Sequence, residues 1–329
     1  MPRKENQKQK LFRLLEMFIR RTDYSHGITM KEIIDGLSEY GISAERKSIY
    51  DDFIVLEELG FTVEKLATKP PSYTLSERPF ELPELKLLVD AVGASKFISE
   101  KRSRELIDKL KGFASIYGAG ELQRQVHVEG RAKTANNATI YITDCIHTAL
   151  NNNLKIKFKY YKYNSKKQKI FRNEGNFYTV NPLALIWQSE RYYLVAMDDR
   201  DGRVKHFRID KMEQASALDI PRDREALSKK IDTADYSQKV FGMYGGEDTL
   251  ITLECKEELS NIIIDRFGTD ISILPVEDGF RVTVRVMVSP TFFGWLAELG
   301  DRARLVGPQG VAEDYIRHLG SILSVYGGR

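Results

Sequence analysis

The chain has 329 residues, of which 42% are hydrophobic and 29% are charged, and its formal net charge is +3. This composition excludes a disordered or fibrous protein and allows two or three domains that each have a hydrophobic core. No window approaches the run of about 18 apolar residues that spans a bilayer, and no signal peptide is recognisable at the start. We therefore expect a cytoplasmic protein that has no membrane partner.

Charge is distributed unevenly along the chain. Residues 1–22 contain seven basic and two acidic residues, whereas residues 246–329 contain eight basic and thirteen acidic ones. Because an acidic segment repels polyanions, we expect any nucleic-acid contact to lie upstream of residue 246.

The first sixty residues have the periodicity of three helices. Apolar residues recur at helical spacing from Leu11 to Ile19, and Thr29 and Glu32 have the spacing of a capping box at the start of a second helix. Ser43 is expected to cap a third helix that ends before Gly60. The apolar residues expected on its buried face are Ile49, Phe53, Leu56 and Leu59.

Two short strands, at 61–65 and 72–75, are predicted on either side of a turn that contains two prolines. Three helices followed by a hairpin is the order of elements in a winged helix-turn-helix domain, which we predict over residues 1–78. In that domain the third helix enters the major groove of DNA. The side chains expected there, on phosphates and base edges, are Arg46, Lys47, Ser48 and Tyr50.

An ordinary amphipathic helix with a charged outer face would show the same residues, and Asp51 and Asp52 would repel phosphate. The run ERKSIYDDF nevertheless resembles the recognition helix of WYL-domain transcriptional regulators, whose pattern is Arg-Arg-Thr-Ile-Tyr-Arg-Asp-Ile. Asp51 stands where many relatives have Arg, which removes one positive charge. The resemblance implies a sequence-specific contact with double-stranded DNA.

Residues 79–135 are predicted to form a helical connector, because two apolar stripes at helical spacing run from Leu85 to Val92 and from Leu106 to Phe113. The resemblance implies that this segment forms a homodimer. Any helical linker would show the same periodicity, so both interpretations stay open. A further helix is predicted over 141–151.

Residues 154–173 contain eight Lys or Arg residues and no Asp or Glu. Apolar residues alternate with Lys155, Lys157 and Lys159, which predicts a half-buried strand whose lysines face outward. Such a surface suits nucleic acid or a phosphorylated ligand, although lysines also protect solvated edge strands from aggregation. Three further strands are predicted before residue 212, two of them joined by a hairpin at Asp201-Gly202, so residues 136–220 are expected to form a small bent sheet or barrel.

The run RYYLVAMDDRDGRVKHFRIDKM resembles the signature of the WYL domain, with Tyr192 in place of the usual Trp and Lys211 in place of the final Arg. The resemblance implies an Sm-like β-barrel that senses an anionic ligand, either single-stranded nucleic acid or a nucleotide. The ligand-binding positions that it implies are Tyr192, Tyr193, Arg203, His206, Phe207, Arg208 and Lys211.

Strand alternation places His206 and Arg208 on one face and Arg203 and Phe207 on the other. We expect the Arg208 guanidinium to bind a phosphate through two parallel hydrogen bonds. The alternative is an ion pair with Asp210 or another carboxylate. For tyrosines the alternative is packing in the core with a hydrogen-bonded hydroxyl.

Residues 221–246 are predicted to be a helix and a flexible linker. Residues 247–329 follow the order strand, helix, strand, strand, helix, strand, with a final helix, which predicts a ferredoxin-like domain. The whole chain is therefore expected to be an α+β multi-domain protein.

An enzyme is not expected, because the five histidines have no metal-ligand spacing and no GxSxG, phosphate-binding loop or dinucleotide motif occurs. We expect no catalytic residue, metal or cofactor. The predicted function is a DNA-binding transcriptional regulator controlled by an anionic ligand. The alternative is a single-strand nucleic-acid-binding accessory protein in defence or DNA-damage response, whose N-terminal domain docks a partner.

Overall fold

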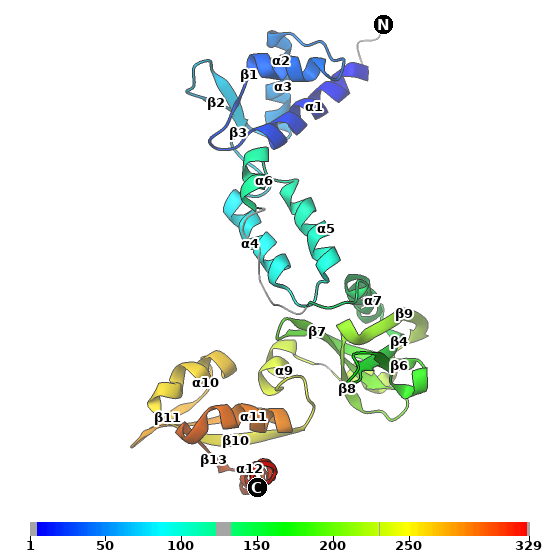
Figure 1. Cartoon of the computed structure of the whole chain (residues 1–329), viewed down its shortest axis with the longest axis vertical. Helices are drawn as coiled ribbons and strands as arrows, with labels where there is room; N and C mark the ends of the chain where they lie inside the picture. The colour runs from blue at the N-terminus through cyan, green and yellow to red at the C-terminus, as the bar shows by residue number, and fades with distance from the viewer. Residues whose placement is uncertain (1–4, 123–132, 230, 328–329) are drawn as a thin grey trace. The chain divides into compact units, whose positions relative to one another are not determined.

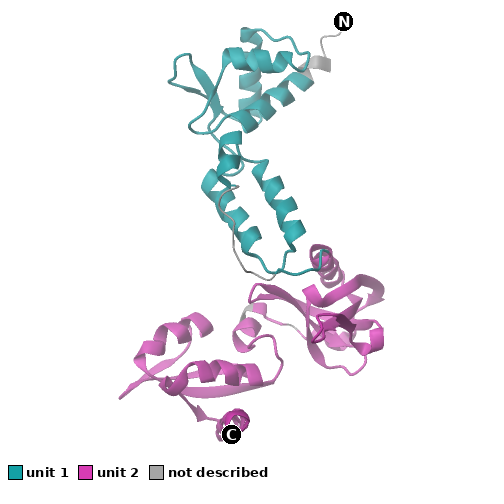
Figure 2. Cartoon of the chain, in the orientation of Figure 1, with its two compact units in different colours: residues 1–137 teal, residues 138–329 magenta. Residues whose placement is uncertain are grey.

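The computed structural model describes residues 5–122, 133–229 and 231–327, so the basic residues before Glu5, and His127, lie outside the described residues. The chain divides into two compact units, residues 1–137 and 138–329 (Figure 2). Within the described ranges no helix is long and apolar enough to cross a bilayer. We describe the hydrophobic cores of the two units in chain order.

The first core of unit 1 lies between three helices and a small sheet (Figure 1). The helices are α1 (Glu5–Arg21), α2 (Met30–Ser38) and α3 (Arg46–Glu58). The strands β1 (Ile28–Thr29), β2 (Val63–Leu66) and β3 (Ser72–Leu75) pair antiparallel in the order β1-β3-β2. The fully buried side chains at the centre are Leu14, Phe18, Ile33, Leu37, Ile49 and Leu56.

The predicted capping box at the start of α2 is confirmed. The amide of Glu32 donates to the Thr29 hydroxyl over 3.3 Å, and the amide of Thr29 donates to the Glu32 carboxylate over 2.7 Å. The predicted cap at Ser43 is wrong, because Glu45 is the extended residue that precedes α3. Leu59 is also not in the core, because it is the C-cap of the helix and is 61% exposed.

The second core of unit 1 lies between the helices α4 (Leu82–Ala94), α5 (Glu100–Lys111) and α6 (Ile116–Leu122). The two apolar stripes in the sequence predicted one helix fewer. Leu85, Val89, Ala114 and Leu122 are buried in this core. The predicted stripes are only partly internal, because Leu88 and Phe113 are 37% and 42% exposed.

Unit 2 begins with α7 (Thr139–Asn151), which packs on a curled antiparallel sheet. The path of this sheet is β5 (Lys169–Phe171), β4 (Leu154–Tyr163), β6 (Tyr178–Gln188), β7 (Arg191–Asp198) and β8 (Val204–Arg208). A sixth strand, β9 (Met212–Pro221), pairs with β4 from its other side. In the described part of the chain β8 and β9 do not pair, so the sheet is a half-barrel that stays open on that side.

Alternation along β4 changes phase near its middle. Ile156 and Phe158 point into the core as predicted, but the next buried ring is Tyr161, at 2% exposed, rather than Tyr160. The register with β9 shifts between Lys157 and Lys159, which marks a bulge at this point. The extra residue turns Tyr161 inward.

The predicted hairpin between β7 and β8 is confirmed. The amide of Asp198 donates to the Arg203 carbonyl over 3.0 Å and closes the turn. Gly202 has φ +64°, which a glycine adopts without steric cost.

Residues 221–246, predicted as a helix and a flexible linker, are helical in part and pack onto this sheet. They contain α8 (Arg224–Ser228) and α9 (Thr233–Lys239). Val240 and Met243, which follow α9, are buried against Ala184, Ile186 and Val195 of the sheet. Burial of these apolar side chains holds the segment in place.

The last part of unit 2 has the predicted order of elements. Its strands are β10 (Glu247–Cys255), β11 (Ile273–Val276), β12 (Gly279–Val288) and β13 (Ala303–Gly307), which pair antiparallel in the order β11-β12-β10-β13. The helices are α10 (Ser260–Phe267), α11 (Pro290–Glu298) and α12 (Gln309–Tyr326). Phe241, which follows α9, is buried in the core of this last part. The preceding residue, Val240, is buried against the half-barrel sheet.

Candidate nucleic-acid interface and anion site

The first turn of α3 carries the residues predicted to contact DNA. Arg46 and Lys47 are exposed, Tyr50 is 37% exposed, and Ser48 is half-buried. The two cations therefore reach solvent on one side of the helix, while Ile49 fixes the opposite side in the core.

Ser48 is bound within the protein. The ammonium group of Lys10, on α1, donates to the Ser48 hydroxyl and, over 3.2 Å, to the Ser48 carbonyl. The same ammonium group forms an ion pair of 2.5 Å with Asp52. Ser48 is thus part of the contact between α1 and α3, and the charge of Asp52 is neutralised rather than directed at a polyanion.

Tyr50 joins α3 to the hairpin. Its hydroxyl lies 2.7 Å from the hydroxyl of Tyr73 on β3, and Arg46 donates to it over 3.4 Å. Burial raises the pKa of Tyr73, and the hydrogen bond to Tyr73 lowers the pKa of Tyr50. These contacts hold the Arg46 side chain near the end of the hairpin.

A further cation was not identified from the sequence. Lys65 on β2 pairs in register with Tyr73 and is close enough to Tyr50 to lower its pKa. Arg46, Lys47 and Lys65 form an exposed basic group, which we call the α3 basic group. Lys65 ends the predicted strand at 61–65, but only the pairing of β2 with β3 places it beside α3.

The seven predicted ligand positions of unit 2 do not form one site. In the antiparallel register Tyr193 stands directly opposite Arg208, and Val195 opposite His206. Tyr192 points to the other face of the sheet, where its ring lies 4.6 Å from that of Trp187. Arg203 is exposed at the far end of the hairpin.

Phe207, predicted as a ligand contact, is a buried residue rather than a surface residue. It is 4% exposed and packs against the rings of Phe158, Tyr160 and Tyr178 at centroid distances of 5.0, 5.3 and 5.4 Å. Successive side chains of β8 point to opposite faces of the sheet, so Phe207 lies on the inner face while its neighbour Arg208 lies on the outer one. The ring therefore stabilises the half-barrel.

Arg208 forms the ion pair that the sequence left as the alternative. Its guanidinium donates to both oxygens of Asp210, over 3.0 and 2.7 Å, and Arg191 donates to the same carboxylate over 2.9 Å. Asp210 is 3% exposed, so it is a buried carboxylate between two half-buried guanidinium groups. The guanidinium hydrogen bonds that were expected to bind a phosphate are thus made to Asp210. The two guanidinium groups and this carboxylate together keep one positive charge in excess.

More cations surround this pair. The Lys211 ammonium group lies 4.2 Å from the ring centroid of Tyr163, and that of Lys169 lies 4.6 Å from the ring of Tyr161. Burial lowers the pKa of Lys211, and the nearby Arg208, Arg191 and Lys169 lower it further. We call these four cations, with Asp210, the Asp210 cation cluster.

Tyrosine rings border the Asp210 cation cluster. The Tyr161 hydroxyl donates to the Asp210 carbonyl over 2.9 Å, and the Tyr160 hydroxyl accepts from the amide of Arg208 over 3.2 Å. Tyr193 is half-buried beside Arg208 and Arg191. Cations interleaved with aromatic rings can bind phosphate and stack bases at the same surface.

His206 is held by the segment after the sheet. Its Nε2 lies 2.8 Å from the hydroxyl of Tyr236 on α9, and burial lowers its pKa to about 4. The ring is therefore neutral at neutral pH and already has a hydrogen-bond partner. It adds no positive charge to the Asp210 cation cluster.

Three lysines of β4 also have partners within the protein. Lys155 forms ion pairs of 2.8 and 3.0 Å with Asp199 and Asp223. Lys157 and Lys159 lie over the ring of Phe177, at 5.4 and 5.3 Å. The strand that is most basic in sequence is thus partly neutralised by carboxylates from elsewhere in unit 2.

Arg191 and Lys169 of the Asp210 cation cluster, and Tyr161 and Tyr163 beside it, were not among the predicted site residues. Arg191 opens the RYYL run and Asp210 lies in FRIDK, so both were within reach of the sequence signal. Among the described residues, no group of three or more His, Cys, Asp or Glu side chains could hold a metal ion.

Comparison with known proteins identifies the first part of unit 2. Residues 142–217 match the family model of the WYL domain. Two solved structures are similar in part: proteasome accessory factor B/C (PafBC) of Arthrobacter aurescens, with 18% identity and a TM-score of 0.29, and a CRISPR Cas-related protein, with 11% identity and a TM-score of 0.35. The matches cover 97% of this chain in both cases, and 48% and 85% of those chains.

The chain thus spans about half the length of the PafBC chain. Both likenesses are too distant to carry a conclusion about function. No curated protein matches the sequence.

Proposed function

We propose that this chain, in which residues 142–217 form a WYL domain, is a DNA-binding transcriptional regulator controlled by an anionic ligand. In this proposal the first 78 residues are a winged helix-turn-helix domain that binds double-stranded DNA through α3. The WYL domain binds single-stranded nucleic acid or a nucleotide, and the chain catalyses no reaction.

The Asp210 cation cluster is the observation that carries the proposal. Four cations, Arg191, Arg208, Lys211 and Lys169, gather near two carboxylates, Asp210 and Glu213, the second of which pairs with Lys169 over 2.5 Å. A polyanion that neutralises this excess also reaches tyrosine rings on which a base can stack, with a gain of about 1–3 kcal/mol per base.

The α3 basic group supports the DNA-binding part of the proposal. Arg46, Lys47 and Lys65 are exposed, and Lys10 neutralises Asp52 behind them. Asp51 is the exposed carboxylate on this turn, and it weakens but does not cancel the excess of positive charge. Charge of this kind binds phosphates in a way that depends on salt.

Duplex binding tests the first part. We expect the Arg46→Ala/Lys47→Ala variant to bind duplex DNA more weakly in fluorescence anisotropy, and the slope of log Kd against log salt to fall by about two. The control is Lys31→Ala/Lys101→Ala, which removes the same charge from two exposed positions of unit 1. If the first variant binds duplex DNA as the wild type does, the regulator proposal fails.

Binding of a short oligodeoxythymidine tests the second part. We expect Arg208→Ala/Lys211→Ala to lose most of its affinity for this probe. The control, Lys162→Ala/Lys166→Ala, removes two exposed cations of the basic segment outside the cluster and should lose much less. Equal loss in both variants would mean that only general charge matters.

The alternative function also has an observation in its favour. Beyond the first turn of α3, Ile54, Val55 and the C-cap residue Leu59 are 58%, 40% and 61% exposed. Exposed apolar side chains suit a protein partner better than they suit phosphates. In the alternative, a single-strand-binding accessory protein for defence or DNA-damage response docks a partner through this face, and the Arg46→Ala/Lys47→Ala variant keeps its duplex affinity.

Regulation requires that the ligand distinguish two states of the protein. By linkage, the ligand must bind the DNA-competent and DNA-incompetent arrangements with different affinities. We propose that these arrangements belong to a homodimer formed through the connector, where α4 exposes Leu87 at 71% and Leu88 at 37%. Sedimentation of a Leu87→Glu/Leu88→Glu variant should then give a monomer where the wild type gives a dimer.

A further inference from the structure

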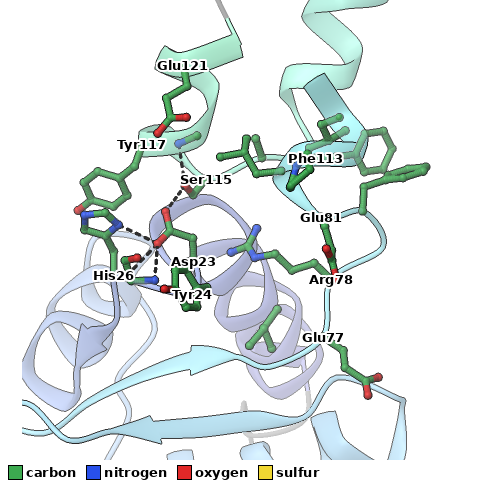
Figure 3. A pocket seen from close by; sticks show the side chains of 18 of the residues that line it. Asp23, Tyr24, His26, Glu77, Arg78, Glu81, Phe113, Ser115, Tyr117 and Glu121 are labelled. Atoms are coloured by element: carbon green, nitrogen blue, oxygen red, sulfur yellow. Dashed lines mark hydrogen bonds and ion pairs between the residues drawn. The ribbon is translucent and has the colours of Figure 1, made fainter. Parts of the chain in front are cut away.

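Unit 1 contains a cavity of about 750 Å³ where its two cores meet. One side is formed by the loop after α1 and the segment after β3, and the other by α4 and by α6 with the residues before it (Figure 3). Small-molecule sites have volumes of about 300–1,000 Å³. The cavity thus has the size of a ligand site, and it lies outside the WYL domain.

The floor of the cavity is apolar. Leu75, Leu85 and Ala114 line it and are at most 8% exposed. At one edge the rings of Phe80 and Phe113 meet at 5.5 Å in a T-shaped arrangement. These surfaces suit the hydrocarbon or aromatic body of a ligand.

The opposite edge is an aromatic pair fixed by a carboxylate. The rings of His26 and Tyr117 stack at 3.8 Å and 12°, and His26 Nδ1 lies 2.7 Å from Asp23. Ser115, from the residues before α6, donates to the other Asp23 oxygen over 2.7 Å. Figure 3 shows Asp23 and Arg78 between this pair and Phe113.

The lining is acidic in sum. Four carboxylates, of Asp23, Glu77, Glu81 and Glu121, line the cavity together with one guanidinium, of Arg78. Without His26 the formal charge of the lining is therefore −3, although Lys86, outside the lining, pairs with Glu121 over 2.8 Å. A cavity lined by one sign of charge raises the local concentration of ions of the opposite sign.

The Arg78 guanidinium is bound within the protein and is not available to a ligand. Its guanidinium donates to the Ile19 carbonyl over 3.0 Å and to the Phe18 carbonyl over 3.2 Å, at the C-terminal end of α1. That end carries partial negative charge, which the guanidinium neutralises. Glu77 at the rim, by contrast, forms no ion pair within the described part of the chain.

We propose that this cavity binds a small organic cation, namely an amine with an aromatic or alkyl body. The body packs between the Phe113 edge and the Tyr117 stack, and the ammonium group lies toward the carboxylates of the rim. This ligand has the opposite charge to the one proposed for the Asp210 cation cluster, so the two sites take different molecules.

The position of the cavity gives such a ligand a way to act. It contacts elements of both cores of unit 1, which the hydrogen bond from Ser115 to Asp23 also joins. An amine that binds better when the cores are held together would change the affinity of α3 for DNA. This consequence rests on the proposed function, whereas the binding itself does not.

Calorimetry on the full chain without DNA tests the binding. We choose tryptamine as the cationic probe, indole-3-ethanol as its neutral analogue and indole-3-acetate as its anionic analogue. We expect tryptamine to bind at least about tenfold more tightly than indole-3-ethanol, and indole-3-acetate to bind least. Equal affinity of the three, or no binding of tryptamine, overturns the proposal.

Two variants locate the site. Phe113→Ala removes part of the apolar edge and should weaken tryptamine and indole-3-ethanol alike. Glu77→Gln removes one charge and should weaken tryptamine alone, by about two- to fivefold at an exposed position. The control Glu64→Gln removes an exposed carboxylate of β2 outside the cavity and should change neither. Tryptamine binding that is unchanged in Phe113→Ala and Glu77→Gln places the amine elsewhere and refutes the assignment.

A separate measurement addresses the consequence for DNA. Duplex affinity is compared with and without saturating tryptamine, in the wild type and in Phe113→Ala. An effect in the wild type that is absent in the variant supports coupling. If calorimetry confirms binding but tryptamine leaves the duplex affinity unchanged, the amine site stands and only its coupling to DNA binding is refuted.

Discussion

Arg208 donates two hydrogen bonds, of 3.0 and 2.7 Å, to the carboxylate of Asp210. Because Arg191 binds the same carboxylate, Asp210 holds two guanidinium groups at one surface of the WYL sheet. Without this carboxylate the two guanidinium groups would repel each other. With it they stay in place and keep an excess of positive charge at the surface. Asp210 therefore both builds the Asp210 cation cluster and limits its charge.

This double role predicts opposite effects on stability and binding. Asp210→Asn should lower the free energy of unfolding by about 1–3 kcal/mol, because hydrogen bonds between charged groups are weakened. It should also raise the affinity for oligodeoxythymidine, because one negative charge is lost beside Arg208. Fluorescence of Trp187 and Trp295, both in unit 2, reports unfolding, and anisotropy reports binding. The control is Asp219→Asn, at an exposed position of β9.

Weaker oligodeoxythymidine binding by Asp210→Asn would mean that the orientation of Arg208, rather than net charge, decides affinity. The cluster would then act as a positioned fork and not as a diffuse cation surface.

Lys10 is predicted to stabilise the contact between α1 and α3. It is 6% exposed and bridges Ser48 and Asp52, so Lys10→Met leaves the Asp52 carboxylate half-buried without its cation. We expect a loss of about 1–3 kcal/mol, less than for a fully buried pair because water reaches Asp52. Hydrogen exchange of the α3 amides measures this loss within unit 1.

The Lys10→Met/Asp52→Asn double variant should lose less than the sum of the two single variants, because the second change removes the charge that the first leaves unpaired. Arg20→Met, at a side chain that is 68% exposed, is the control and should change stability little. Additive losses would show that Lys10 acts by packing alone.

His206 is predicted to make unit 2 less stable in mild acid. Its pKa is about 4 in the fold and 6.5 in an unfolded chain, so the unfolded state binds more protons between these values. Stability therefore falls as pH drops from about 6.5 to about 4, by up to about 3 kcal/mol. Urea unfolding at pH 7 and pH 5, followed by tryptophan fluorescence, should show this fall in the wild type.

His206→Asn removes the titrating group and should show a smaller fall over the same pH interval. An identical fall in both proteins would assign the acid sensitivity to other groups. Asp198, whose pKa several hydrogen bonds hold below its ordinary value despite burial, loses stabilisation only at lower pH and does not interfere with this comparison.

The segment after α9 is predicted to be a folded part of unit 2. Met243 is 4% exposed against the sheet, so Met243→Ala should cost about 2–4 kcal/mol and expose residues 231–246 to protease. Tyr244→Ala, at a neighbouring side chain that is 60% exposed, is the control and should be mild. Rapid cleavage of the wild type within this segment would contradict the packing.

Much of the local structure could be predicted from the sequence. The capping box of Thr29 and Glu32, the glycine that follows α3 and the hairpin at Asp201-Gly202 depend on residues at most five apart, so their signals are local. The order of strands and helices in the last part of unit 2 followed from periodicity in the same way. Charge counts could indicate a basic segment, but not which carboxylates neutralise it.

Only the tertiary structure decided which predicted residues are available to a ligand. Phe207 is internal because the curled sheet brings Phe158 and Tyr178 against it, and His206 is occupied because α9 returns to the sheet with Tyr236. The cavity in unit 1 likewise depends on Asp23 and Ser115, which are 92 residues apart. The sequence by itself determined the order of most helices and strands and which segments carry charge, since these follow from neighbouring residues. Which charges stay free depends on contacts between distant residues, and these exist only once the chain has folded.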